Sequence, residues 1–412
     1  MPSVLRRLLL LLAGLDRWLL ATPRTFRAAV IAFTLAVMVA WSLPNVPRQY
    51  VDFAGLPVIG DVQKYETYGP DSLSDMYGAR VILNDPSDMY TKARTEQTPL
   101  EASTWSKEAS APYPPAVLLA EAGLYAVGDW SGVGFYGMIL GCAILFVGLS
   151  LLYFLRTRWY LFPLLYLNFG YFSGRFVYVQ DNTYLVMLVV VMIALFLARA
   201  GQPASHAVMA VATTMKLSPL YYAKNVVRMP REYAVLYLAI LAAGLVLPYF
   251  VWDNYLYIYR YGNELKGDMA STVGALMLAA PFALVLWYIE VKLGFDREDL
   301  VGWGLVPFAL FLGFKMNVAR HLLIVLLVPD KRALRNVAAA IGLAVPTLLP
   351  GIVLFNSSLV IATLVLIIGL AGYLDEIGWA AVRDDVRNPV RTLRLLLSGR
   401  GDATDAVALA DR

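Results

Sequence analysis

Long apolar runs separated by short polar stretches fill most of this chain of 412 residues. Many of the runs have the length of about 20 residues with which a helix crosses the hydrocarbon core of a membrane. They predict helices at residues 4–20, 26–43, 116–127, 133–155, 160–177, 184–198, 206–227, 233–251, 272–293, 301–328, 337–354 and 359–374. We therefore expect an all-α polytopic membrane protein with about 10 to 12 transmembrane or re-entrant helices.

The composition agrees with this class of protein. Hydrophobic residues make up 59% of the chain and charged residues only 16%, whereas about a quarter of the residues in soluble domains are charged. With one cysteine, Cys142, and two histidines, His206 and His321, the chain has no disulfide framework and no thiolate or histidine-rich metal site. We expect no metal and no cofactor. Basic residues stand beside helix ends, so nucleic acid is not an expected partner.

The distribution of charge predicts the topology. Residues 1–25 read as an amphipathic interfacial helix, and five arginines stand before or at the start of the segment 26–43, which predicts a cytoplasmic N-terminus. Residues 45–112 then form an extracytoplasmic loop with short interfacial helices. This loop carries six Lys/Arg and ten Asp/Glu. We expect a multi-pass plasma-membrane protein whose membrane domain covers residues 26–375.

The C-terminal region, residues 376–412, reads as a cytoplasmic amphipathic helix followed by a disordered tail. Its basic cluster spans residues 383–394, and further clusters follow several of the earlier apolar segments. If all these clusters face the cytoplasm, the segments 116–127, 206–227 and 301–328 cannot be simple crossings. The alternative is that some clusters do not obey the positive-inside rule. Broken or re-entrant helices are tolerated at membrane depth where they line a cavity.

Basic residues occupy the second and third of these segments. Lys216 precedes Pro219 near the middle of one, and the other contains Lys315, Arg320 and His321. An ionisable residue at membrane depth costs about 2.5–3.5 kcal/mol on insertion scales and is a functional candidate. Lys216 suits the phosphate of an anionic lipid headgroup. The alternative is that it pairs with a carbonyl group or extends to the interface.

Polar residues also gather on the predicted outer side. Gln180 and Asn182 lie in a polar interruption between two apolar runs, and each side chain can donate and accept hydrogen bonds, as sugar hydroxyls require. An ordinary capped turn is the alternative. In the long loop, Asp61 is followed by Tyr65, and Tyr113 precedes two prolines at the return to the membrane. Spacing alone does not choose Asp61 over the other loop carboxylates, which include Asp52, Glu66, Asp71, Asp75, Asp85 and Asp88.

The order of these motifs is more specific than each motif alone. Asp61-x-x-x-Tyr65, Tyr-Pro-Pro at residues 113–115, Gln180-x-Asn182, Lys-x-x-Pro at residues 216–219 and a late polar break with His321 follow one another. This series resembles the GT-C superfamily of integral-membrane glycosyltransferases. It is most similar to polyprenyl-phosphate-mannose-dependent α-1,2-mannosyltransferases such as the phosphatidylinositol-mannoside enzymes. The resemblance covers roughly residues 26–375, with a departure at position 179, where the family usually has glycine.

The resemblance implies a GT-C-like fold and an inverting hexosyltransferase. Asp61 would be the general base, and Lys216, His321, Arg320 and Lys315 would hold the donor phosphate. Side chains that contact sugar or acceptor would be those of Tyr65, Gln180, Asn182 and Tyr113. The enzyme would move a sugar, with mannose as the leading candidate, from a polyprenyl-phosphate donor to a lipid-linked or glycan acceptor at the outer membrane face. Arabinosyl, other pentosyl or phospho-group transfer within the same fold is one alternative. A polyprenol-phosphate or lipid transporter or flippase is another.

Overall fold

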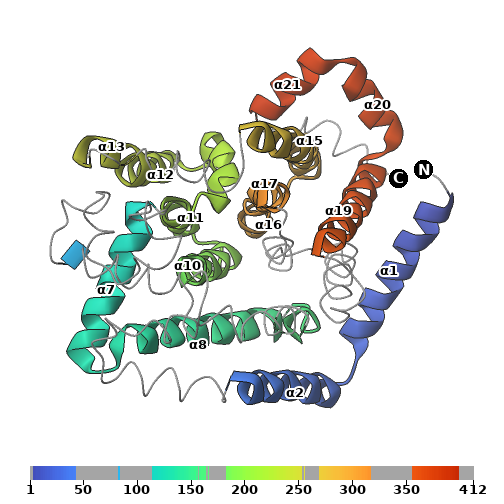
Figure 1. Cartoon of the computed structure of the whole chain (residues 1–412). Coiled ribbons are helices and arrows are strands. Elements are labelled where there is room, and N and C mark those ends of the chain that lie inside the picture. Colours follow the sequence, from blue (N-terminus) through green and yellow to red (C-terminus); the bar gives the residue numbers. More distant parts are fainter. Residues whose placement is uncertain are drawn as a thin grey trace.

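The structure, a computed structural model, describes residues 3–42, 82–83, 114–155, 157–163, 166, 182–252, 255, 269–316 and 355–398. Within these ranges every element of regular structure is a helix (Figure 1). The first half of the chain contributes α1 (Ser3–Ala21), α2 (Arg24–Ser42), α7 (Pro115–Ser131), α8 (Gly134–Leu155), α10 (Asn182–Arg199) and α11 (Ala204–Met215). The second half contributes η3 (Ser218–Arg228), α12 (Arg231–Leu241), η4 (Ala242–Val246), α13 (Leu247–Val251), α15 (Met269–Leu293), α16 (Arg297–Trp303), α17 (Val306–Met316), α19 (Phe355–Ile377), α20 (Trp379–Arg387) and α21 (Pro389–Ser398).

Three stretches of helix in the described ranges are long and apolar enough to cross a membrane. They are Gly137–Leu155 in α8, Arg231–Val251 along α12, η4 and α13, and Val273–Leu293 in α15. A fourth is added if the bent pair of α1 and α2 counts as one span. The prediction of a helical membrane protein agrees with this finding. The predicted total of about 10 to 12 helices includes segments outside the described residues, such as 337–354.

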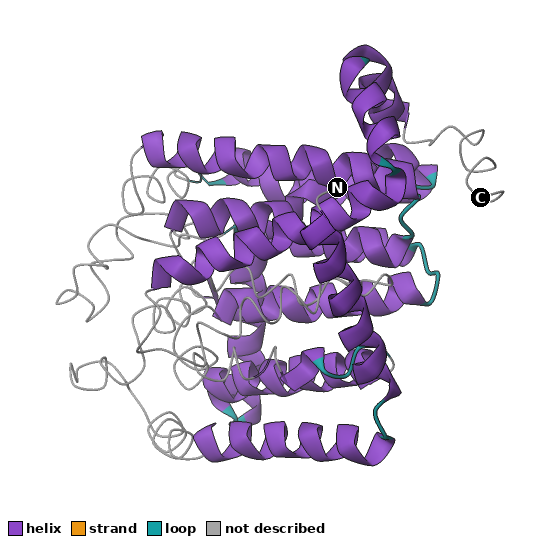
Figure 2. Ribbon diagram, turned by 90° about the vertical axis from the view of Figure 1, so that its right-hand side faces the viewer, coloured by secondary structure: helices purple, strands orange, loops and turns teal. Residues whose placement is uncertain are grey.

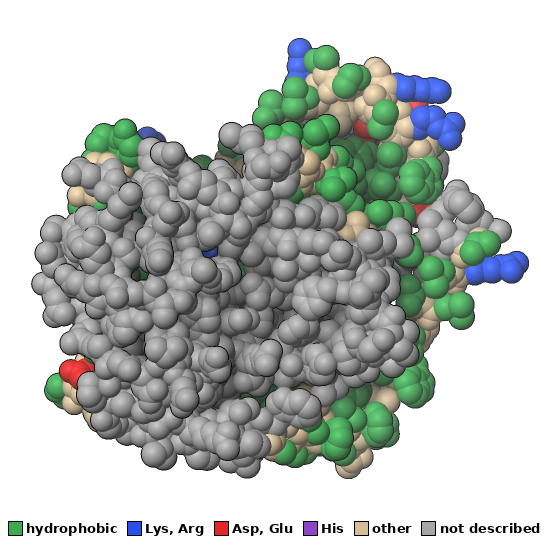
Figure 3. All heavy atoms as spheres, in the orientation of Figure 1, with side chains coloured by type: hydrophobic (Ala, Val, Ile, Leu, Met, Phe, Trp, Pro, Cys, Tyr) green, Lys and Arg blue, Asp and Glu red, His purple; other side chains and the backbone are tan. Residues whose placement is uncertain are grey.

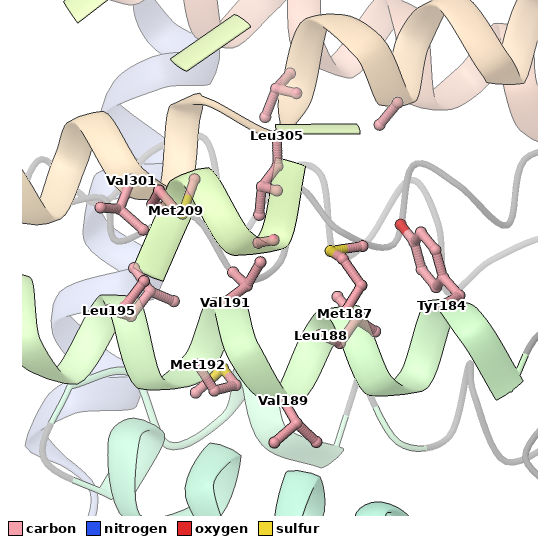
Figure 4. Packing of buried hydrophobic residues seen from close by; sticks show 14 of the residues in the cluster. Tyr184, Met187, Leu188, Val189, Val191, Met192, Leu195, Met209, Val301 and Leu305 are labelled. Atoms are coloured by element: carbon pink, nitrogen blue, oxygen red, sulfur yellow. The ribbon is translucent and has the colours of Figure 1, made fainter. Parts of the chain in front are cut away.

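Helix α10 is the centre of the packing. It contacts α7 and α8 on one side and α11 and α16 on the other. Figure 4 shows Val189 and Met192 pointing towards one side, while Val191 and Leu195 point towards Met209 of α11 and Val301 of α16. The fully buried side chains of α10 are Met187, Val191, Met192, Ala194 and Leu195. A helix that is apolar around its whole circumference can pack on several sides at once. Helix α10 does so here, although Ile193 is 40% exposed.

The corner between α7 and α8 depends on a close backbone approach. A methyl group on Gly128 would stand 2.5 Å from the carbonyl oxygen of Gly134. Only glycine lets the two backbones come this near without displacement. The positive φ angles of Gly132 (74°) and Gly134 (76°) turn the chain between the helices.

Helix α1 meets α2 at an angle of 94°. It is attached to the turn after α8, because Arg158 Nε lies 3.2 Å from Asp16 Oδ1 and Trp159 Nε1 donates a hydrogen bond of 3.0 Å to the carbonyl oxygen of Leu19. Asp16 is only 1% exposed. Figure 2 shows most of the other helices running side by side, with α1 crossing their direction.

The C-terminal helices α19, α20 and α21 follow one another with sharp bends (Figure 1). Gly378, with a φ of 93°, separates α19 from α20, and Pro389 begins α21 directly after α20. Helix α19 packs against α15, and α21 returns to contact α15 as well. The described chain therefore ends in a helical hairpin attached to one of the candidate spans.

Candidate functional site

The helix break predicted at Lys216 is present in the structure. Helix α11 ends at Met215, and Lys216 has an extended backbone with φ −151° and ψ 130°. The chain continues as η3, a 3₁₀-helix that begins at Ser218 and has Pro219 in its first turn. Proline lacks the N–H group that would continue the α-helix, so the break follows from the sequence. A 3₁₀-helix of 11 residues is unusual, since most run for three or four residues.

The break places Lys216 beside the first turn of α10. Its Nζ lies 4.6 Å from the centre of the Tyr184 ring, a cation–π contact. Tyr184 stands two residues after Asn182, the first residue of α10. The N-terminal N–H groups of a helix have no partner within the helix, and its dipole is positive there. An ammonium group at this helix end therefore favours an anion.

The structure describes few of the other predicted site residues. Asn182 begins α10 and Lys315 lies in α17, but their side chains are not among those described. Outside the described residues lie Asp61, Tyr65, Tyr113, Gln180, Arg320 and His321. The structure thus connects Lys216 with the helix that follows the Gln180–Asn182 motif, and the remaining site assignments stay predictions.

A second polar group, which the sequence analysis did not single out, lies where η3 packs near α15. Lys224 of η3 forms an ion pair with Glu290 of α15, and their side chains are 10% and 0% exposed. The ammonium also lies 4.2 Å from the centre of the Tyr221 ring, and the Tyr221 hydroxyl donates a hydrogen bond of 2.9 Å to the carbonyl oxygen of Ala283. These contacts fix η3 against a candidate span.

A buried carboxylate on α7 was also missed. Glu121 is 0% exposed and lies on the helix that packs against α8, α10 and α11. The criterion that selected Lys216, an ionisable residue in an apolar run, applies equally to Glu121 and to Glu290. Both could therefore have been found from the sequence.

Buried polar contacts also connect α11 with η3 and α8 with α16. His206 Nδ1 lies 2.7 Å from the hydroxyl of Tyr222, and both side chains are buried. Tyr153 donates a hydrogen bond of 2.6 Å to Glu298, whose carboxylate lies 4.0 Å from Arg199. Among the described residues, no three His, Cys, Asp or Glu side chains gather as metal ligands would. The metal-free site remains a prediction, because most of its residues lie elsewhere in the chain.

No family model matches the chain, and no curated protein or solved structure matches it significantly. The function of the chain is therefore inferred from its own residues and from the order of their motifs.

Proposed function

We propose that the chain is an inverting membrane glycosyltransferase. It transfers a sugar from a polyprenyl-phosphate donor to a hydroxyl group of a lipid-linked or glycan acceptor at the outer membrane face. Mannose is the leading candidate for this sugar. The observation that carries the proposal is the helix break that sets Lys216 beside the first turn of α10. The resemblance of the motif order to the GT-C superfamily supports the same function.

The proposed reaction is a direct displacement. The acceptor oxygen attacks C1 of the sugar and forms the new glycosidic bond, while the bond between C1 and the phosphate oxygen breaks. Asp61 takes the proton from the acceptor hydroxyl, and the polyprenyl phosphate leaves with the electron pair. Charge develops on the departing phosphate, so a cation placed there stabilises the transition state. One carboxylate acting as base is sufficient, because the compensated phosphate needs no proton to leave.

In this mechanism Lys216 and the first turn of α10 receive the donor phosphate together. The ammonium is a compact charge with three donors, and its contact with Tyr184 restricts where it can move. Cytoplasmic termini and an outward-facing site belong to the same proposal, with the acidic loop of residues 45–112 supplying Asp61.

A transfer assay tests the proposal. Purified protein in lipid nanodiscs is given radiolabelled polyprenyl-phosphate mannose and a panel of membrane lipid acceptors, and labelled product is counted. Asp61→Asn should lower kcat about 10²- to 10⁴-fold, the usual contribution of a general base. Lys216→Ala should raise the KM for the donor about 10- to 100-fold, as expected for the loss of a charged hydrogen bond.

Arg231→Gln is the matched control for the loss of a cation, because Arg231 is exposed at the start of α12. Its kinetics should equal those of the unchanged protein. Transfer that is unaffected by Asp61→Asn would remove Asp61 as the base. Lipid translocation without transfer, sensitive to Lys216→Ala and insensitive to Asp61→Asn, would instead identify a transporter.

A further inference from the structure

The C-terminal hairpin of α20 and α21 carries an exposed surface in which basic and apolar side chains alternate. All four of its arginines are exposed, namely Arg383, Arg387, Arg391 and Arg394. Exposed apolar side chains stand between and beside them, at Trp379, Val386, Val390, Leu393 and Leu397. Figure 3 shows Lys and Arg side chains gathered with hydrophobic ones over this part of the molecule, at the upper right.

The attachment of the hairpin sets its depth relative to the candidate span. Asp385 Oδ2 lies 2.8 Å from Lys292 Nζ and accepts a hydrogen bond of 2.8 Å from the hydroxyl of Tyr288. Tyr288 and Lys292 belong to the last turns of the candidate span Val273–Leu293. A hairpin held at the end of a membrane-crossing helix lies at the level of the lipid headgroups.

The charge of this surface is positive. Residues 379–398 contain four arginines and two aspartates, a net charge of +2. Asp385 is turned towards Lys292 and is 7% exposed, so Asp384 is the one carboxylate of the hairpin on its exposed side. Basic amphipathic helices with this composition lie in the interface of membranes that contain anionic lipids.

The pattern favours a lipid surface over a protein partner. Protein interfaces have an apolar centre with a polar rim, whereas here arginine and aliphatic residues alternate along both helices. This arrangement lets aliphatic side chains enter the acyl boundary while each guanidinium stays among phosphates. We propose that α20 and α21 form a docking surface for the headgroups of acidic phospholipids. The proposal is independent of the proposed glycosyl transfer.

The single cysteine of the chain makes the test direct. Cys142→Ala combined with Leu393→Cys gives one labelling position on α21 for an environment-sensitive fluorophore. The full chain is reconstituted in vesicles of phosphatidylcholine, or of phosphatidylcholine mixed with increasing phosphatidylglycerol, and quenching by acyl-chain-brominated phosphatidylcholine is measured. Quenching should rise with the phosphatidylglycerol fraction and should fall again at high salt.

Two double variants test whether the arginines cause the binding of the hairpin to anionic lipid. Arg387→Gln with Arg394→Gln should lower the docking equilibrium constant more than tenfold, because each arginine near an anionic surface contributes about fivefold. The matched control, Arg24→Gln with Arg231→Gln, removes the same charge from exposed positions on other helices and should leave the quenching curve unchanged. Quenching that is independent of phosphatidylglycerol, or equal losses in both paired variants, would overturn the proposal.

Discussion

Lys224 and Glu290 form an ion pair between the 3₁₀-helix η3 and the candidate span α15, with both side chains almost completely removed from solvent. The two residues are far apart in the sequence, so the pair connects two segments that local structure alone would not hold together. Each charge depends on the other, because a single unpaired charge at this depth would lack compensation.

We predict a strong non-additivity at this pair. Glu290→Met or Lys224→Met alone should each lower the free energy of unfolding by about 3–5 kcal/mol, since each removes the main partner of a buried charge. The double variant should recover most of that loss, because two apolar side chains of similar volume replace the pair. Unfolding in detergent micelles measures this cycle. Losses that simply add would show that the two side chains do not interact.

The close contact at Gly128 predicts a loss of stability on substitution, and Gly123 on the same helix provides the control. Gly128→Ala should destabilise the protein by about 1–3 kcal/mol, the usual cost of overpacking, because the new methyl group meets the carbonyl oxygen of Gly134. Gly123→Ala on the same helix meets no atom within 4 Å and replaces glycine by a better helix former, so it should be neutral or slightly stabilising. Thermal unfolding of both variants compares them. Equal midpoints would contradict the close approach of α7 and α8.

The attachment of α1 should depend on Asp16. Asp16→Ala removes the carboxylate that faces Arg158, and backbone hydrogen exchange in α1 should become about 10- to 100-fold faster, as for the loss of a charged hydrogen bond. Arg17→Ala is the control on the neighbouring position, because Arg17 is exposed and donates to the carbonyl oxygen of Ala13 within its own helix. Unchanged exchange in the Asp16 variant would assign the docking of α1 to other contacts.

The attachment of α20 and α21 to α15 should weaken only in acid. Burial alone would raise the pKa of Asp385, but hydrogen bonds from Lys292 and Tyr288, with the charges of Lys292 and Arg391, outweigh it and hold the pKa below its ordinary value. The contribution of Asp385 to the attachment of the hairpin to α15 is therefore fully present above the unfolded pKa of about 3.9. It is lost as the pH falls through the lower, folded pKa.

Hydrogen exchange of α20 in zwitterionic micelles, corrected for intrinsic rates, measures this dependence. Protection should be constant from about pH 5 to pH 8 and should fall below about pH 4. Asp385→Asn should show weaker protection without the acid step. A step near neutral pH would point to a different group.

The bounds of the long helices were predictable because each of these helices coincides with an apolar run in the sequence. The predicted segments 133–155 and 272–293 correspond to α8 and α15 with small shifts at their ends. The break at Lys216 was also predictable, since proline chemistry is local. A second break was missed between α16 and α17, near Gly304, inside the predicted segment 301–328. The sequence carries a signal for this break, because Pro307 stands three residues after Gly304 and lacks the N–H group that would continue the helix.

Partners across the fold were not predictable from one sequence. The apolar run at residues 272–293 indicates that Glu290 lies in a helix. The identity of the residue that faces Glu290 depends on how η3 packs against α15. The same holds for Asp16 and Arg158, which come from distant segments. For the candidate site, sequence reasoning found Lys216 and its helix break, but not that its ammonium lies against Tyr184.

The unusual length of η3 has a mechanical consequence. A 3₁₀-helix rises about 2.0 Å per residue and an α-helix about 1.5 Å, so rewinding the 11 residues of η3 into α geometry would shorten it by about 5 Å. Spin labels at Leu220 and Val227, both exposed, would detect the contraction, and a fixed distance between them would rule it out. Lys224, the seventh of these residues, is paired with Glu290 of α15, so somewhat more than half of the shortening would displace the end of η3 that adjoins Lys216.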